Sequence, residues 1–243
     1  MANQSITAPL GFQVAGVRSG IKQSGKLDLG MIYCPTGARA AAVFTTNKIV
    51  SAAVEVCRSH VKHAKIDALV VNSGNANACT GQQGLNNAIA MCRDTAQHLG
   101  TKPGNVLVAS TGIIGEQLPM PKVRSGISAA AGSMSVSARA GLDFAKAIMT
   151  TDTRPKQAQR QIKISGKQVT LAGTVKGAGM IGPNMATTLC FITTDLAISK
   201  PLLGRALKGA IGNSLNKLTV DSHQSTNDTA VFLTSGLVGN RPV

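Results

Sequence analysis

The 243-residue sequence contains few aromatic residues and few acids. Tryptophan is absent, tyrosine occurs once and phenylalanine five times. Asp and Glu together number 10 against 25 Lys and Arg, which gives a formal net charge of +15, yet only 14% of the residues are charged. Because about 25% of residues are charged in a typical globular chain, the imbalance reflects missing acids and not surplus cations.

Long apolar runs, a leader and a cysteine framework are also missing. No uninterrupted apolar stretch approaches the roughly 18 residues that indicate a membrane span. The start, Met1 to Ser5, has no basic region followed by an apolar one, so we expect no secretory signal. The five cysteines are odd in number and scattered, which favours reduced thiols and a cytoplasmic location. With 43% hydrophobic residues, the chain as a whole is not disordered.

Short β-like runs alternate with helical patterns, which predicts a mixed α/β or α+β fold. The runs expected to form strands are mostly rich in Val, Thr or Leu and lie close to Gly, Asn or Pro. They are residues 40–46, 67–72, 105–110 and 168–175.

Three segments have helical patterns. The clearest is 82–99, which is followed by Gly100 at the C-terminal cap position and has apolar residues at a spacing of three or four, namely Leu85, Ile89, Cys92, Ala96 and Leu99. A second helix is expected after Met120, with Pro121 in its first turn. A third is expected to open with Ser199 as N-cap and Pro201 in its first turn. Its inward-facing residues should be Leu203, Leu207, Ile211 and Leu215.

Three polar, glycine-rich loops follow predicted strands, at residues 72–77, 110–115 and 176–188. Glycine lets the backbone approach a ligand closely or adopt a positive φ. Plain tight turns would explain one such loop, but three in one chain favour a binding site, because functional residues gather on loops that a rigid scaffold positions.

Metal and nucleic-acid sites are less well supported. Cys57, His60 and His63 lie three residues apart, but a structural zinc site needs four ligands, and we expect no metal. The densest basic stretch runs from Arg154 to Lys176 and would form one cationic face. It has no interleaved aromatic residues on which bases could stack. A solvated face that attracts small anions is therefore favoured over a basic nucleic-acid-binding module.

The third loop places Thr187 at the head of an apolar strand, 188–193. A hydroxyl held there could attack the carbonyl of Ala186, and hydrolysis of the resulting ester would free Thr187 as a new N-terminus. The α-amine so released has a reference pKa of roughly 7.7–8.0, so it could act as the base for its own hydroxyl. Threonine with an N-terminal amine is a recognised activated nucleophile.

The segment from Lys176 to Thr187, with the two residues after it, closely resembles the processing motif of the ornithine acetyltransferase/glutamate N-acetyltransferase family of arginine biosynthesis. The resemblance continues over essentially the whole chain, in order, at residues 8–12, 16–22, 43–47, 72–77, 110–115, 149–152, 219–221 and 225–229. It implies an α/β layered sandwich of the ornithine acetyltransferase type. In that fold, residues 1–186 match the family's α-chain and residues 187–243 the beginning of its β-chain.

The resemblance also implies a site and a reaction. Thr187 would be the autoprocessing residue and then the acetylated nucleophile, with cleavage after Ala186. Thr111 and Gly112 would stabilise the oxyanion, whereas Thr150 and Lys176, with Thr187 itself, would bind substrate. Acetyl would pass from N-acetylornithine to glutamate, with acetyl-CoA as a further donor in some members and no cofactor or metal. The cleaved α and β chains would assemble as a heterotetramer of two of each.

The sequence departs from the family pattern in two places. Family members continue well past the segment that matches 219–229, so we expect a fold that is incomplete at the C-terminus, in a fragment or a truncated form. Residues 222–224, Ser-His-Gln, replace the family's usual Gly-Asp-Thr type of run. An inactive homologue and a related N-terminal-nucleophile amidohydrolase are therefore the alternatives to an active acetyltransferase.

Overall fold

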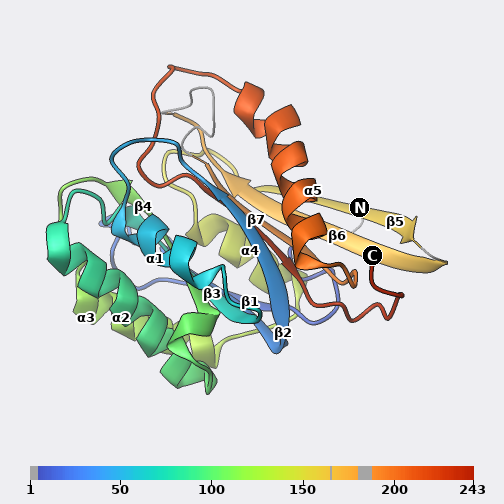
Figure 1. Ribbon diagram of the computed structural model, residues 1–243. Helices are drawn as coiled ribbons and strands as arrows, with labels where there is room; N and C mark the ends of the chain where they lie inside the picture. Colours follow the sequence, from blue (N-terminus) through green and yellow to red (C-terminus); the bar gives the residue numbers. More distant parts are fainter. Residues whose placement is uncertain (1–4, 165, 180–187) are drawn as a thin grey trace.

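One long strand, β2 (Leu29–Phe44), organises the sheet in the computed structural model, which describes residues 5–164, 166–179 and 188–243. Its first half pairs with β1 (Gln13–Val17) on one side and with β3 (Ile66–Asn75) on the other. Its second half pairs with β8 (Thr229–Thr234). The strand therefore belongs to both halves of the molecule (Figure 1).

The pairing of β2 with β3 is interrupted between Tyr33 and Ala38. Pro35 lies in this interval and has no N–H to donate to a ladder, whereas Gly37 has a φ of +78°, which favours glycine. The sequence thus interrupts a single strand at the point where it passes from one half of the sheet to the other.

The remaining strands complete a sheet of order β4-β3-β2-β8-β7-β6-β5, with β1 beside β2. Two neighbouring pairs are parallel, β3 with β4 and β7 with β8, and the other pairs are antiparallel. The bounds are Val106–Ile113 for β4, Lys156–Ile164 for β5, Lys167–Lys176 for β6 and Leu189–Thr194 for β7.

Helices cover the outer faces of the two halves. Helices α2 (Gly81–Leu99) and α3 (Met120–Gly132) pack on the half that contains β3 and β4, and α5 (Lys200–Asn213) packs on the half that contains β7 and β8 (Figure 1). Helix α1 (Ala52–His60) lies against β4 and α2, and α4 (Ala138–Ala147) lies against β1.

One core lies under the helices on the outer face of each half, and a third core, the inner core, lies between the inner faces of the two halves of the sheet. It joins residues of β3 and β4, such as Leu69 and Leu107, to residues of β7 and β8, such as Val231. Phe144 of α4 meets Phe191 of β7 edge-on inside it, with ring centroids 5.8 Å apart. This core makes the molecule a layered α/β sandwich and brings the two halves of the sheet face to face.

The predicted elements are confirmed, with one error about which residues face inward. All four predicted strands and all three helices are present, although the strand expected at 40–46 is the end of the much longer β2. Gly100 has the left-handed C-cap conformation, with a φ of +65°. Ile89 is 47% exposed, because the buried face of α2 is centred on Ala88, Met91 and Cys92. Leu215 lies beyond the end of α5 but, half-buried, still packs against the core under that helix as predicted.

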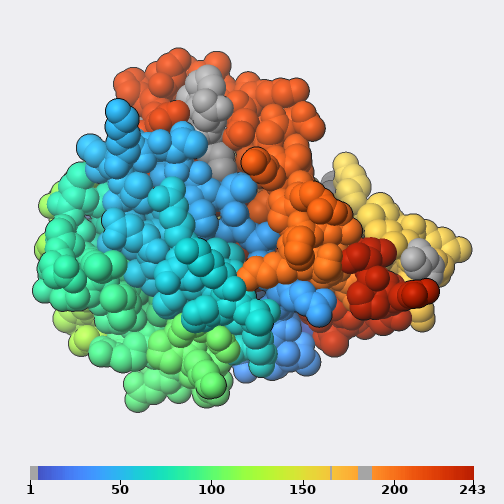
Figure 2. All heavy atoms as spheres, viewed as in Figure 1, coloured from blue at the N-terminus to red at the C-terminus, as the bar shows by residue number. Residues whose placement is uncertain are grey.

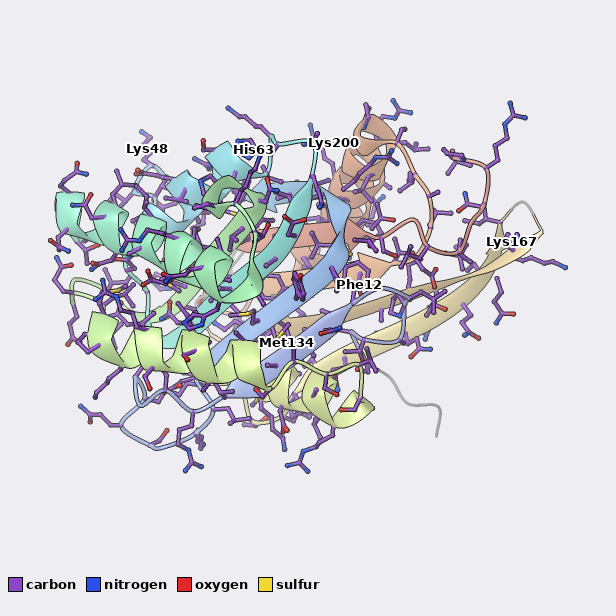
Figure 3. All side chains as sticks on the ribbon, turned by 90° about the horizontal axis from the view of Figure 1, so that it is seen from below. Phe12, Lys48, His63, Met134, Lys167 and Lys200 are labelled. Atoms are coloured by element: carbon purple, nitrogen blue, oxygen red, sulfur yellow. The ribbon has the colours of Figure 1, made fainter. Side chains whose placement is uncertain are left out.

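The expected single cationic face is wrong, because its residues form the β5–β6 hairpin. This hairpin projects from the body of the molecule (Figures 1 and 2), with Lys167 at its tip (Figure 3). Side chains alternate between the two faces of a strand, so Arg160 and Lys163 point to opposite sides. Lys176 is not on the surface, since only 2% of it is exposed.

Among the described helices, none is long and apolar enough to cross a membrane.

Candidate active site

A cavity of about 740 Å³ lies at the carboxyl ends of β3, β4 and β6. Four of the predicted site residues line it, namely Thr111, Gly112, Thr150 and Lys176. Ala186 and Thr187, the predicted cleavage pair, lie outside the described residues. The structure thus brings together every predicted site residue that it describes.

Lys176 is the buried cation of this cavity. Its Nζ donates a hydrogen bond to Thr111 Oγ1 at 3.0 Å, which joins the end of β6 to the end of β4. Burial lowers the pKa of Lys176, and the charges of Asp152 and Asp228 act in the opposite direction. An amino group stripped of water in this way interacts strongly with any carboxylate that enters the cavity.

Asp152 holds together the two segments that carry Thr150 and Gly177. Its Oδ1 accepts hydrogen bonds from Gly177 N at 2.9 Å and from Lys156 Nζ, and its Oδ2 accepts one from Thr150 N at 3.4 Å. Lys156 Nζ also donates to Gly177 O at 3.0 Å. Burial raises the pKa of Asp152, but the hydrogen bonds from Lys156, Gly177 and Thr150 outweigh it and leave the pKa below its ordinary value. The ionised carboxylate therefore fixes Thr150 beside the end of β6.

The end of β4, which carries Thr111 and Gly112, is held by its parallel neighbour β3 and by the residues that follow β3. Ala76 N donates to Ile113 O at 2.8 Å, so the loop after β3 supports the end of β4. Gly112 has a φ of +139°, and a Cβ at this position would lie 2.3 Å from the carbonyl carbon of Gly74. Only glycine fits here, which explains the glycine of the predicted oxyanion pair.

Asn227 and Asp228 lie just before β8, where Asn227 bonds to the segments at the ends of β3 and β4, and Asp228 bonds to the residue before β7. The Asn227 side chain is buried, and its Nδ2 donates to Ala76 O at 2.6 Å and to Ser110 O at 2.8 Å. Asp228 Oδ1 accepts from Thr188 N at 2.8 Å. Burial raises the pKa of Asp228 to about 8, against the opposing effects of the Thr188 amide and of Lys176.

Sequence reasoning gave no role to Asp152, Asn227, Asp228 or Lys22. Three of them lie in runs that carried the family resemblance, 149–152 and 225–229. The sequence therefore marked these positions, but their roles could be assigned only from the contacts that the structure shows. Lys22 also lies in a matching run and lines the cavity, where its Nζ donates to Leu27 O at 2.7 Å. Burial lowers the pKa of Lys22 to about 8.

The three residues considered for zinc, Cys57, His60 and His63, make contacts that do not converge on one point. Cys57 is fully buried in the inner core, whereas His60 Nδ1 lies 2.8 Å from Val106 O. The His60 ring stacks on that of His63, with centroids 5.8 Å apart. Among the described residues, no group of three or more His, Cys, Asp or Glu side chains could hold a metal ion.

Solved structures share this fold. The arginine biosynthesis bifunctional protein argJ of Bacillus halodurans is 40% identical, with a TM-score of 0.73 over 76% of this chain and 96% of that chain. The ornithine acetyltransferase of Mycobacterium tuberculosis, solved as a complex with ornithine, is 36% identical, with a TM-score of 0.68 over 75% of this chain and 96% of that chain. The fold is therefore the layered α/β sandwich of the ornithine acetyltransferase type.

Sequence comparison gives the family. A model described as the ArgJ family matches residues 13–242, and the chain belongs to this family. The arginine biosynthesis bifunctional protein ArgJ of Symbiobacterium thermophilum is 47% identical over 237 residues, which are 97% of this chain and 58% of that protein. The chain thus spans little more than half the length of the curated relatives that it matches.

The geometry at Gly112 predicts that Gly112→Ala lowers the free energy of unfolding by several kcal/mol. A left-handed backbone alone costs an alanine about 1–2 kcal/mol, and here the Cβ would also collide with Gly74. Gly115→Ala is the matched control, because Gly115 has a φ of +88° but open space around its Cβ position. Equal losses for the two variants in urea unfolding would show that the collision has no effect.

The raised pKa of Asp228 predicts a stability that depends on pH. In the unfolded chain the carboxyl ionises near pH 3.9, whereas in the folded chain it keeps its proton up to about pH 8. Between these values the unfolded state binds fewer protons, so the wild type should lose stability as the pH rises. Relative to Asp228→Asn, the loss should approach about 1.4 kcal/mol per pH unit. Urea unfolding from about pH 5 to about pH 8 measures it, and parallel curves for the two proteins would contradict it.

Proposed function

We propose that this protein is a self-processing acetyltransferase that moves an acetyl group from N-acetylornithine to glutamate. The observation that carries the proposal is the convergence of Thr111, Gly112, Thr150 and Lys176 on one cavity. These residues come from three separate segments, and the family resemblance, which rests on sequence alone, implies that they share one site. A chance match of motifs would not place these residues around one cavity.

Thr187 is the nucleophile in this proposal. It first attacks the carbonyl of Ala186 and is freed as an N-terminus, and its α-amine then takes the proton of its own hydroxyl. The hydroxyl oxygen attacks the acetyl carbonyl of N-acetylornithine, and ornithine leaves with that proton. The amine of glutamate then attacks the acetyl-threonine and regenerates the hydroxyl.

In this scheme the cavity residues stabilise the negative charges of the substrate and of the reaction intermediate. Thr111 and Gly112 stabilise the oxyanion that develops on the acetyl oxygen, an interaction whose loss typically lowers the rate by about 10²–10³-fold. Lys176 pairs with the α-carboxylate that donor and acceptor share. Thr150, held by Asp152, lines the same cavity and orients the substrate.

The lengths of the relatives support cleavage. The match to the Symbiobacterium thermophilum protein takes in 97% of this chain but only 58% of that protein. The match to the Bacillus halodurans structure takes in 76% of this chain and 96% of the solved chain. The solved chain is therefore far shorter than the curated relative. Such a difference is expected if the polypeptide is divided in the mature protein. We further propose that the two pieces assemble as two of each, in the cytoplasm.

The proposal is tested by mass spectrometry and by acetyl transfer. The wild-type chain should yield two fragments that meet between Ala186 and Thr187, and Thr187→Ala should remain intact. Transfer of labelled acetyl from N-acetylornithine to glutamate should depend on cleavage, with Lys167→Met as a control at the hairpin tip. An intact wild type would contradict self-processing, and release of free acetate in place of acetylglutamate would favour the amidohydrolase alternative. Acetyl-CoA supplied in place of N-acetylornithine tests the second donor.

The assignment of Lys176 predicts that Lys176→Met weakens the binding of both substrates. A hydrogen bond to a charged group contributes about 1.5–3 kcal/mol, so KM for N-acetylornithine and for glutamate should rise about 10- to 100-fold. Steady-state kinetics with each substrate varied in turn measures the change. If only kcat fell, Lys176 would act on the chemical step and not on carboxylate binding.

A further inference from the structure

Two lysines line the cavity at the ends of β3, β4 and β6, and the proposed function uses only one of them. Lys176 is buried, and Lys22, from the segment between β1 and β2, is half-buried. Neither ammonium forms an ion pair with a carboxylate among the residues that the structure describes. Glu116, the one acid among the described lining residues, is exposed. Because a charge removed from water needs a counter-charge, two unpaired cations in one cavity indicate a ligand with two negative groups.

The segment that carries Lys22 is held in place by a buried aspartate. One carboxylate oxygen of Asp28 accepts hydrogen bonds from Ser19 N at 2.6 Å and from Ser19 Oγ at 2.9 Å, and the other accepts from Lys22 N at 3.0 Å. The carbonyl of Asp28 accepts from Ser73 N at 2.8 Å, which ties the segment to β3. Both carboxylate oxygens are thus used to shape the segment, and Asp28 positions Lys22 without forming an ion pair with its ammonium.

The Lys22 side chain lies against the end of β3. Its Cγ lies 3.0 Å from the position that a Cβ on Gly74 would occupy, and Gly74 is paired with Gly112 of β4. Its Nζ donates to Leu27 O at 2.7 Å. An ammonium has three N–H donors, so two of them are without a partner among the described residues. The stem of Lys22 is therefore fixed beside the predicted oxyanion residues, and its ammonium can still donate to a ligand.

Lys200 shows how a lysine with a purely structural role is bonded in this protein. Its Nζ donates to two backbone carbonyls, Val61 O and His63 O, each at 2.7 Å. These bonds join the start of α5 to the residues that follow α1. Lys22 makes only one such bond and lines the cavity.

The pKa of Lys22 also reflects the nearness of Lys176. Burial is the main cause of its low value, and the charges of Lys26 and Lys176 lower it further. The charges of Asp28 and Asp152 act in the opposite direction. A carboxylate bound beside Lys22 would relieve the repulsion between the two ammonium groups of the cavity.

We propose that Lys22 binds the side-chain carboxylate of glutamate and makes the cavity selective for a dicarboxylate acceptor. This inference rests on the proposed function, in which Lys176 pairs with the α-carboxylate, and it assigns the residue that recognises the acceptor. Glutamine has an amide in place of the second carboxylate, and the side chain of N-acetylornithine ends in an ammonium group. Neither of them offers a negative group to Lys22.

The first test measures the binding of glutamate and of glutamine to the full chain by isothermal titration calorimetry. The wild type should bind glutamate at least about 10-fold more tightly than glutamine. Lys22→Met keeps an apolar stem without the ammonium, so it should bind glutamate about 10- to 100-fold more weakly than wild type and glutamine equally well. Lys22→Arg keeps the charge and should keep the preference for glutamate. Lys26→Met is the matched control, because Lys26 is an exposed lysine of the same segment that does not line the cavity.

The second test is acetyl transfer at steady state with each substrate varied in turn. In Lys22→Met, KM for glutamate should rise about 10- to 100-fold, whereas KM for N-acetylornithine should not rise. This split distinguishes Lys22 from Lys176, whose loss should raise both values. An equal rise in both values for Lys22→Met would indicate a general disturbance of the cavity and overturn the inference.

The outcomes separate this inference from the proposed function. A wild type that prefers glutamate through Lys22 but transfers no acetyl group contradicts the proposed function and supports the dicarboxylate site. Acetyl transfer with an unchanged preference for glutamate in Lys22→Met overturns the role of Lys22 alone. A wild type that binds glutamate no more tightly than glutamine, or binds neither, also overturns it. If thermal unfolding shows that Lys22→Met does not fold, wild type and Lys22→Arg decide: a preference for glutamate in both supports the inference, and its loss in Lys22→Arg overturns it.

Discussion

The hydrogen bond between Lys176 and Thr111 is the constraint on which the site depends. The two residues lie at the ends of β6 and β4, strands that are separated by four others in the sheet order, yet their side chains meet at 3.0 Å. Such a contact requires the sheet to turn back on itself, as the interrupted β2 and the inner core allow. It also requires a buried amino group, whose desolvation is opposed only in part by the charges of Asp152 and Asp228. The cavity, the sandwich fold and the two acids near Lys176, Asp152 and Asp228, therefore depend on one another.

Local sequence patterns predicted the elements well and their faces less well. Gly100 and Pro121 marked helix ends because capping depends on neighbouring residues alone. Ile89 was misassigned because a three- and four-residue spacing fits more than one stripe on α2, and tertiary packing selected the stripe with Ala88 and Met91. The long β2 was predicted only in its last part, 40–46, although the strand begins at Leu29 and continues through the irregularity at Pro35 and Gly37.

The candidate site was predictable only where a motif named the residue. Thr111 and Lys176 were found through the resemblance, but composition placed Lys176 on a solvated basic face, the opposite of its buried position. Asp152 and Asp228 had no recognisable role, because their partners lie at Gly177 and Thr188, far along the chain. Contacts of that kind depend on which strands become neighbours and where those strands begin and end, which no local pattern records.

The pairing of β6 with β7 has a consequence for subunit stoichiometry. The two strands flank residues 180–187 and are hydrogen-bonded neighbours from Leu171↔Thr194 to Lys176↔Leu189, and β7 is paired with β8 on its other side. A break in the chain between them would create an interface made of the interior of one sheet and one shared core. Neither polypeptide could exchange for a different partner without exposing that interior. Two subunits formed in this way begin in a one-to-one ratio, because each pair comes from a single translated chain.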